Sequence, residues 1–193
     1  MILLQGRPLA LIYLTLFGAW LIGEVALLMR RRASTGLAAR DGGFVARALL
    51  VMLLTNFVAI VALKFFHGAT FATYFSACAG LVLMGMGLML RWWSVVHLGR
   101  FFTVNVAVSV DQPVVDTGPY RWIRHPSYAG MLMIVAGIGV CFGNLVSILV
   151  ILIPMIALML KRMRIEEEAL ANALGDAYRN YIGRTKRLIP ALY

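Results

Sequence analysis

Long apolar runs separated by shorter polar stretches dominate the pattern of this chain. The runs cover about residues 8–29, 44–66, 71–90, 127–143 and 145–161. A helix needs about 20 mostly apolar residues to cross the hydrocarbon core of a bilayer. The pattern therefore predicts five transmembrane helices. The last two runs adjoin at Gly143-Asn144, which predicts a helical hairpin, and Gly139 and Gly143 form a GxxxG that lets helices approach closely.

A sixth segment, about residues 163–182, repeats its apolar residues at helical spacing on one face only. That face holds Ile165, Ala169, Leu170, Ala173, Leu174, Ala177, Tyr178, Tyr181 and Ile182. This spacing predicts an amphipathic helix that lies on the membrane or on the protein itself, with Gly175 as a weak point. The expected fold class is an all-α integral membrane protein, with about five transmembrane helices and a cytoplasmic C-terminal amphipathic helix.

Composition and charge agree with a membrane protein rather than a nucleic-acid-binding one. Of the 193 residues, 62% are hydrophobic and only 13% are charged, whereas soluble domains carry roughly 25%. The net charge is +10, but the basic residues gather at the ends of the apolar runs, where cytoplasmic loops collect them. We therefore expect no nucleic acid partner.

The distribution of basic residues also predicts the orientation. The stretch after the first run is basic through Arg30, Arg31, Arg32, Arg40 and Arg47, whereas the stretch after the second run has only Lys64 and His67. The N-terminus is then outside, and the region 91–126 and the C-terminus are cytoplasmic. The first run precedes its basic cluster, which favours a retained helix over a cleaved signal peptide.

Cysteine and histidine give no sign of a metal site or a disulfide framework. Cys78 and Cys141 both lie inside apolar runs, and the three histidines are scattered. Neither residue type has the spacing of metal ligands. We therefore expect no metal.

A polar cluster, GPYRWIRHPSYAG, stands directly before the fourth run at residues 118–130. Gly118 and Pro119 predict a turn, and the residue before Pro126 is pushed away from helical geometry. The result is a shaped loop that presents hydrogen-bonding side chains: Tyr120, Arg121, Arg124, His125 and Tyr128. Such residues also serve as ordinary anchors at a membrane interface. The predicted topology puts this loop on the same side as the C-terminal helix, so the two can meet.

A second charged cluster, KRMRIEEEAL at residues 161–170, continues the fifth run. Arg162 and Glu166 stand four residues apart, as do Arg164 and Glu168, so each pair shares a helix face. Acidic residues suit the start of a solvated helix. The alternative is that they bind a cationic group or pair with the arginines of the loop.

These motifs together resemble the isoprenylcysteine carboxyl methyltransferases and their prokaryotic relatives. That family is similar in GPYxxxRHPxYxG, a hairpin with an Asn, RxxxEExxL, FGxxYxxY and a late RxxP. This chain has GPYRWIRHPSYAG, Asn144, RMRIEEEAL, LGDAYRNY and RLIP. Leu174 stands where the family usually has an aromatic residue. The resemblance covers about residues 90–190, and the superfamily also includes phospholipid N-methyltransferases.

The resemblance implies an integral membrane methyltransferase that uses S-adenosylmethionine. It implies cofactor binding by Gly118, Tyr120, His125, Pro126, Tyr128 and Glu166, and catalytic roles for Arg124, Arg162 and Glu167. The chain would then be one membrane-embedded domain, with three helices in 1–90 and the cofactor-binding portion in 91–193. The active site would face the cytoplasm of a prokaryotic inner membrane, and a lipophilic or prenylated substrate would enter from the bilayer. The chain has no GxGxxG loop, which is the signature of a soluble dinucleotide-binding fold.

Elementary chemistry agrees with these residue types. Methyl transfer mainly requires alignment of the nucleophile with the methyl group. A carboxylate substrate is already a nucleophile and needs a cation to place it, for which Arg124 or Arg162 is suitable. An amine substrate is protonated in water and needs a base, and Glu167 is then the candidate.

Several alternatives stay open on the sequence. They are a phospholipid or other amine N-methyltransferase, a sterol-reductase-like enzyme, and a non-enzymatic membrane scaffold. The acceptor atom and the oligomeric state are not determined. Glu24, an acidic residue inside the first run, is either functional, directed to the interface or paired with Arg30 or Arg31. His97 belongs either to the site or to the membrane boundary.

Overall fold

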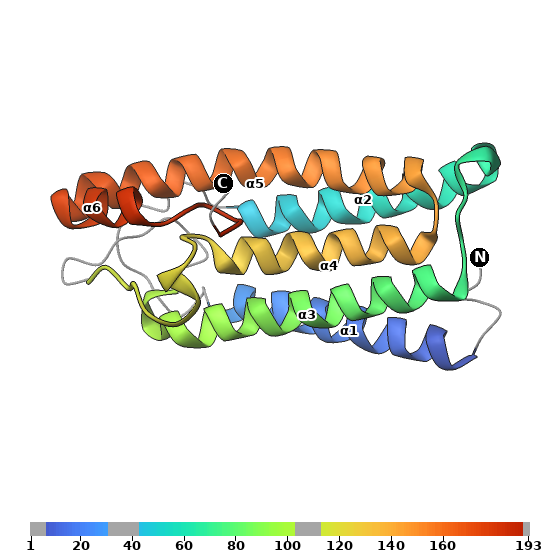
Figure 1. Ribbon diagram of the computed structural model, residues 1–193, viewed down its shortest axis with the longest axis horizontal. Coiled ribbons are helices and arrows are strands. Elements are labelled where there is room, and N and C mark those ends of the chain that lie inside the picture. The colour runs from blue at the N-terminus through green and yellow to red at the C-terminus, as the bar shows by residue number, and fades with distance from the viewer. Residues whose placement is uncertain (1–6, 31–42, 103–112, 191–193) are drawn as a thin grey trace.

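The computed structural model describes residues 7–30, 43–102 and 113–190. The described part is helical, without strands beyond two isolated bridges. The helices, in chain order, are α1 (Arg7–Arg30), α2 (Phe44–Phe65), η3 (His67–Ala69), α3 (Tyr74–Leu98), η4 (Gly99–Phe101), η5 (Gly118–Arg121), α4 (Pro126–Phe142), α5 (Leu145–Leu174) and α6 (Asp176–Arg184) (Figure 1).

The five long helices run alongside one another as an elongated bundle (Figure 1). The contacts follow the order α1, α3, α4, α5 and α2, so α4 lies between α3 and α5. Four of them, α1, α2, α3 and α5, are long and apolar enough to cross a membrane. The fifth, α4, has 17 residues, which is the lower end of what can span. The chain is thus an all-α integral membrane protein.

Caps and glycines set the helix ends. Thr73 and Ser76 form a reciprocal capping box at the start of α3. Asn144 caps α5 by accepting from the Ser147 backbone N–H at 3.0 Å. The Asn144 amide also donates to the Phe66 carbonyl at 2.9 Å, which ties the predicted α4–α5 hairpin to the segment after α2. Gly143 ends α4 in the left-handed conformation, with φ +63°.

Two helix boundaries differ from the sequence prediction. Helix α3 continues through Leu98, eight residues past the predicted end of the third run, and stops at Gly99 with φ +55°. No separate helix begins near residue 163, because α5 runs unbroken to Leu174. The chain breaks instead at Gly175, with φ +58°, and α6 follows. The acidic run therefore lies on the same helix as the fifth apolar run.

The closest helix contact is between α3 and α4, where glycines of both helices face each other. A Cβ added at Gly87 would lie 2.6 Å from the Gly130 carbonyl oxygen. One added at Gly80 would lie 2.7 Å from the corresponding oxygen of Gly137. Small residues let helix backbones touch in this way. The predicted GxxxG acts differently: Gly139 packs against Ile148 of α5, and Gly143 is the cap described above.

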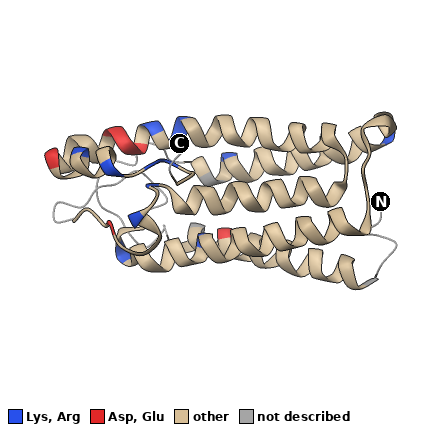
Figure 2. Ribbon diagram, in the orientation of Figure 1, with Lys and Arg blue, Asp and Glu red and all other residues tan. Residues whose placement is uncertain are grey.

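Charged residues gather at the end of the bundle where α6 lies (Figure 2). An exception inside the bundle is Glu24 of α1, which pairs with Arg91 of α3 at 2.6 Å. The expected alternative of pairing with Arg30 or Arg31 concerns side chains outside the described part of the structure. Of the basic residues used to predict the orientation, Arg31, Arg32 and Arg40 lie outside the described residues.

Candidate functional site

The polar loop, residues 118–126, runs from η5 to the first residue of α4. Gly118 has φ +57°, which favours glycine, and a Cβ there would lie 2.6 Å from the His97 ring. His97 Nε2 lies 2.9 Å from the Thr117 hydroxyl. Pro119 and Pro126 each stand in the first turn of a helix, where proline is tolerated. Glycine and proline thus fix the path of the loop, and His97 of α3 lies directly beside it.

The C-terminal tail, residues 185–190, pairs with this loop. Ile123 and Lys186 form a parallel bridge. The backbone N–H of Arg124 donates to the Lys186 carbonyl at 2.7 Å, and that of His125 donates to the Arg187 carbonyl at 3.0 Å. The sequence predicted that the loop can meet the C-terminal helix, and here the loop pairs with the tail that follows α6.

Glu167 of α5 is the centre of an ionic cluster that joins the loop and the tail. Its Oε1 accepts from Arg124 Nε at 2.9 Å and lies 3.2 Å from His125 Nε2. Its Oε2 accepts from Arg187 Nη2 at 2.6 Å. The Glu167 side chain is only 10% exposed. Two guanidinium groups therefore balance one buried carboxylate, and three chain segments converge on it.

Arg124 extends the same cluster to α6. Its Nη1 donates to the Ile182 carbonyl at 3.1 Å and also to the Thr185 carbonyl. A guanidinium that holds a carboxylate and two carbonyls fixes the relative positions of α5, α6 and the tail. The direct catalytic roles expected for Arg124 and Glu167 stay predictions.

A second group of predicted residues lies along α4, α5 and the start of α2. The Tyr128 hydroxyl donates to Glu166 Oε2 at 2.9 Å, and Arg162 Nε donates to the Tyr128 oxygen at 3.4 Å. The Arg162 guanidinium lies over the Phe44 ring, 5.0 Å from its centroid. Tyr128, Arg162 and Glu166 are thus brought together. The sequence reasoning missed Phe44 as a site residue, because the pattern places it at the start of the second apolar run but not beside Arg162 of α5.

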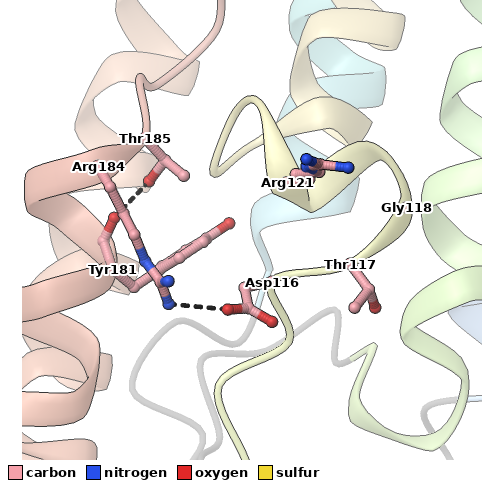
Figure 3. Close-up of a pocket in the computed structure, with 7 residues that line it drawn as sticks. All are labelled: Asp116, Thr117, Gly118, Arg121, Tyr181, Arg184 and Thr185. Atoms are coloured by element: carbon pink, nitrogen blue, oxygen red, sulfur yellow. Dashed lines mark hydrogen bonds and ion pairs between the residues drawn. The ribbon is translucent and has the colours of Figure 1, made fainter.

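A half-open pocket of about 600 Å³ lies between the polar loop and α6 (Figure 3). Its lining residues are Asp116, Thr117, Gly118, Arg121, Tyr181, Arg184 and Thr185. Within this lining, Arg184 Nη2 donates to Asp116 Oδ2 at 2.7 Å. Two arginines, one aspartate and a tyrosine give the pocket groups for both signs of charge.

The structure thus sorts the nine predicted site residues into separate places. Arg124, His125 and Glu167 form the ionic cluster, and Gly118 lines the pocket. Tyr120 and Pro126 are buried in the packing behind them. The remaining lining residues were not predicted as site residues, although Arg121 was noted as part of the loop and Tyr181 as part of the apolar face. Two features of the sequence could have pointed to these residues. Some of them lie close to Gly118 along the chain, and the others lie in or just after the helix that follows Gly175.

Tyr181 connects the pocket to the loop, and its replacement by phenylalanine is a test of that contact. The hydroxyl donates to the Tyr120 carbonyl at 2.7 Å, so we expect Tyr181→Phe to lower the free energy of unfolding by about 1 kcal/mol. Burial raises the pKa of Tyr181 to about 12, against about 10 in an unfolded chain. The folded state therefore holds the proton more tightly.

It follows that the stability difference between wild type and Tyr181→Phe is constant below about pH 10 and shrinks as the pH rises towards about 12. Denaturant titrations of both proteins, from neutral pH upward, measure this difference. A difference that grows with pH would contradict the contact.

Fold and site together define the class: an integral membrane protein with a polar site at one end of an apolar helix bundle. Residues 78–172 match the isoprenylcysteine carboxyl methyltransferase family. This segment, just under half of the chain, is therefore similar to that family.

Individual relatives show a similarity to the same family. Over 124 residues, the chain is 30% identical to a protein-S-isoprenylcysteine O-methyltransferase of Schizosaccharomyces pombe, covering 63% of this chain and 52% of that protein. It is 28% identical over 143 residues to protein-S-isoprenylcysteine O-methyltransferase B of Arabidopsis thaliana, covering 73% and 72%. The chain thus spans about half of the first of these relatives and about three quarters of the second.

A solved structure of the eukaryotic intramembrane Ras methyltransferase, an isoprenylcysteine carboxyl methyltransferase, has a similar fold. The TM-score is 0.70 at 21% sequence identity, and the match covers 93% of this chain and 65% of that one. Because the match includes nearly the whole chain, the similarity in fold extends to the N-terminal helices that lie before the segment matched by the family.

Proposed function

We propose that this protein is an integral membrane methyltransferase that uses S-adenosylmethionine and methylates the carboxylate of an isoprenylcysteine-like lipophilic substrate. The observation that carries the proposal is the convergence of the polar loop, the acidic end of α5 and the C-terminal tail at one end of an apolar bundle. Such a site lets a water-soluble cofactor meet a substrate that is dissolved in the bilayer. The similarity of residues 78–172 to the isoprenylcysteine carboxyl methyltransferase family supports the reaction type.

The residues at this end fit the proposed cofactor. S-adenosylmethionine supplies a methyl group on a cationic sulfur, and it also carries an ammonium, a carboxylate and an adenosine. The pocket offers Asp116 for a cation, and Arg121 and Arg184 for an anion. Glu166 and the hydroxyl of Tyr128 add acceptors on the neighbouring helices. The pocket volume of about 600 Å³ is in the range of ligand sites.

The cofactor-binding residues that the resemblance implied take distinct parts in this proposal. Gly118 lets this wall of the pocket pack directly against His97, because a side chain there would collide with the ring. Tyr120, His125 and Pro126 hold the shape of the loop from behind. Tyr128 and Glu166 lie outside the pocket lining, and we propose that they reach the cofactor from α4 and α5.

We further propose that Arg162 orients the substrate carboxylate. Arg162 lies between the ring of Phe44 and the hydroxyl of Tyr128, so a cation and an apolar aromatic surface stand side by side. That combination suits an acid that carries an isoprenoid chain. Arg124 and Glu167 then act as the frame that keeps the loop and α5 in register. A carboxylate needs no proton removed, so no base is required.

The proposed location follows from the distribution of charge. The basic residues described at the site end favour a cytoplasmic location for that end, and we propose that the membrane is a prokaryotic inner membrane. The lipid chain of the substrate reaches the site from the bilayer along the apolar helices. Membrane lipids are thus the surrounding partners.

Titration of S-adenosylhomocysteine into the detergent-purified protein tests cofactor binding. We expect binding at micromolar affinity that His125→Ala weakens at least tenfold, since His125 shapes the loop through Glu167 and the tail. His67→Ala is the matched control, because His67 is exposed in η3, near the other end of the bundle, and its replacement should leave the affinity unchanged. No binding by a folded wild type would refute the proposed cofactor.

The product identifies the acceptor atom. With a labelled methyl donor and either farnesylcysteine or phosphatidylethanolamine, we expect label only in the prenylated acid. A methyl ester releases methanol in alkali, whereas a methylamine keeps its label. Stable label in the phospholipid would favour the amine N-methyltransferase instead.

A further inference from the structure

We propose that Glu24 of α1 is a positioning residue for the candidate site, an inference whose catalytic consequence rests on the proposed function. Glu24 lies outside the segment that matches the family, yet it is linked to the polar loop through two buried side chains. The link runs from Glu24 to Arg91 of α3, and from Arg91 to Ser127 in the first turn of α4.

The ion pair is bidentate and buried. Arg91 Nε donates to Glu24 Oε1 at 2.6 Å, and Nη2 donates to Oε2 at 2.7 Å. Glu24 is 2% exposed and Arg91 is 5% exposed. Such a pair is geometrically specific, because the planar fork of arginine matches the carboxylate in one orientation.

The remaining nitrogen of Arg91 is directed to α4. Nη1 donates to the Ser127 hydroxyl at 2.9 Å and to the Ser127 carbonyl at 3.3 Å. The guanidinium thus lies at the N-terminal end of α4, where the helix dipole is positive and disfavours a cation. The carboxylate of Glu24 offsets that repulsion and keeps Arg91 in place.

Ser127 lies between two residues of the candidate site. His125, two positions before, lies 3.2 Å from Glu167, and Tyr128, one position after, donates to Glu166. A displacement of the first turn of α4 would therefore shift both contacts at once. The three helices also touch here: a Cβ on Gly130 would lie 2.7 Å from the Arg91 backbone nitrogen, and one on Gly23 would lie 2.6 Å from Trp92.

Apolar replacement of both partners distinguishes a purely structural ion pair from a positioning pair. Stability can recover in either case, but only the loss of a positioning pair changes the loop and the turnover. Breaking a buried pair leaves an uncompensated charge, whereas replacing both partners by apolar residues of similar volume is often neutral for stability. We expect Glu24→Gln to lower the melting temperature by about 5 °C or more. The double variant Glu24→Met/Arg91→Met should recover most of that loss, but not the geometry of Ser127.

The test compares these variants in three measurements: melting temperature, hydrogen–deuterium exchange of residues 118–130, and methyl transfer. For the double variant we expect a melting temperature near wild type, faster exchange in 118–130 and at least a tenfold loss of kcat. Asp176→Asn, which breaks an exposed ion pair with Arg179 on α6, is the control and should change none of these. Wild-type exchange and turnover in the double variant would overturn the proposal.

Ser127→Ala provides a second route should the double variant not fold. It removes only the hydroxyl that Arg91 contacts, so we expect a nearly unchanged melting temperature and faster exchange in 118–130. Unchanged exchange in Ser127→Ala would also overturn the proposal. If the wild type binds no S-adenosylhomocysteine, the proposed function fails, whereas the exchange data still decide whether Glu24 positions the loop.

Discussion

Replacing Glu167 with glutamine is expected to reduce methyl transfer at least a hundredfold. The substitution keeps the volume of the side chain but removes the carboxylate that joins Arg124 and Arg187. The guanidinium of Arg124, whose side chain is 9% exposed, then loses the carboxylate beside it, which costs about 3 kcal/mol or more. The polar loop and the tail lose their common anchor on α5. Turnover with a labelled methyl donor, together with the melting temperature, measures both effects.

The neighbouring residue provides the matched control. Glu168 is exposed on the same helix turn, so Glu168→Gln removes the same charge without touching the cluster. We expect wild-type turnover and stability from it. Arg124→Ala should reproduce the loss seen with Glu167→Gln, and the double variant should lose little more, because residues that act as one unit are not additive. Retained activity in both single variants would refute the role given to the cluster.

Replacing Gly87 with alanine is expected to destabilise the protein by about 2 kcal/mol or more, although alanine favours helix. A Cβ at this position would lie 2.6 Å from the Gly130 carbonyl oxygen, so α3 and α4 would have to separate. The site depends on this contact, because the polar loop leads directly into the first turn of α4. Thermal unfolding in detergent measures the change.

Gly85, two residues earlier on the same helix, is the control for this substitution. A Cβ there meets nothing within 4 Å. Gly85→Ala is therefore expected to raise stability by up to about 1 kcal/mol through helix propensity alone. Should Gly87→Ala and Gly130→Ala behave like Gly85→Ala, the close contact between α3 and α4 would be wrong.

Some errors in the predicted helix boundaries arose from reading hydrophobicity instead of helix breakers. The predicted end of the fifth run near Lys161 follows the loss of apolar residues, but no glycine or proline interrupts the chain between there and Leu174. A helix continues through charged residues as long as its backbone hydrogen bonds are kept. The glycines at 99 and 175 mark the true ends of α3 and α5.

The sequence by itself determined the class of fold and the general place of the site. Apolar runs of about 20 residues indicate helices in a bilayer, because a helix satisfies its backbone polar groups within its own segment. The prolines and glycine of the polar loop, and its basic and aromatic side chains, were enough to indicate a site beside the fourth run. The motif RHPSY followed by RIEEEAL indicated the family.

Tertiary structure alone decided which charges meet. Glu24 and Arg91 are 67 positions apart, and Arg124 and Glu167 are 43 apart, and no local periodicity connects them. These partners depend on the order in which the helices pack, and that order depends on where glycines allow α3 and α4 to touch. A sequence pattern specifies which face of a helix is apolar. The partner of a buried charge is specified only by three-dimensional packing, because a charge that is buried without a partner costs free energy.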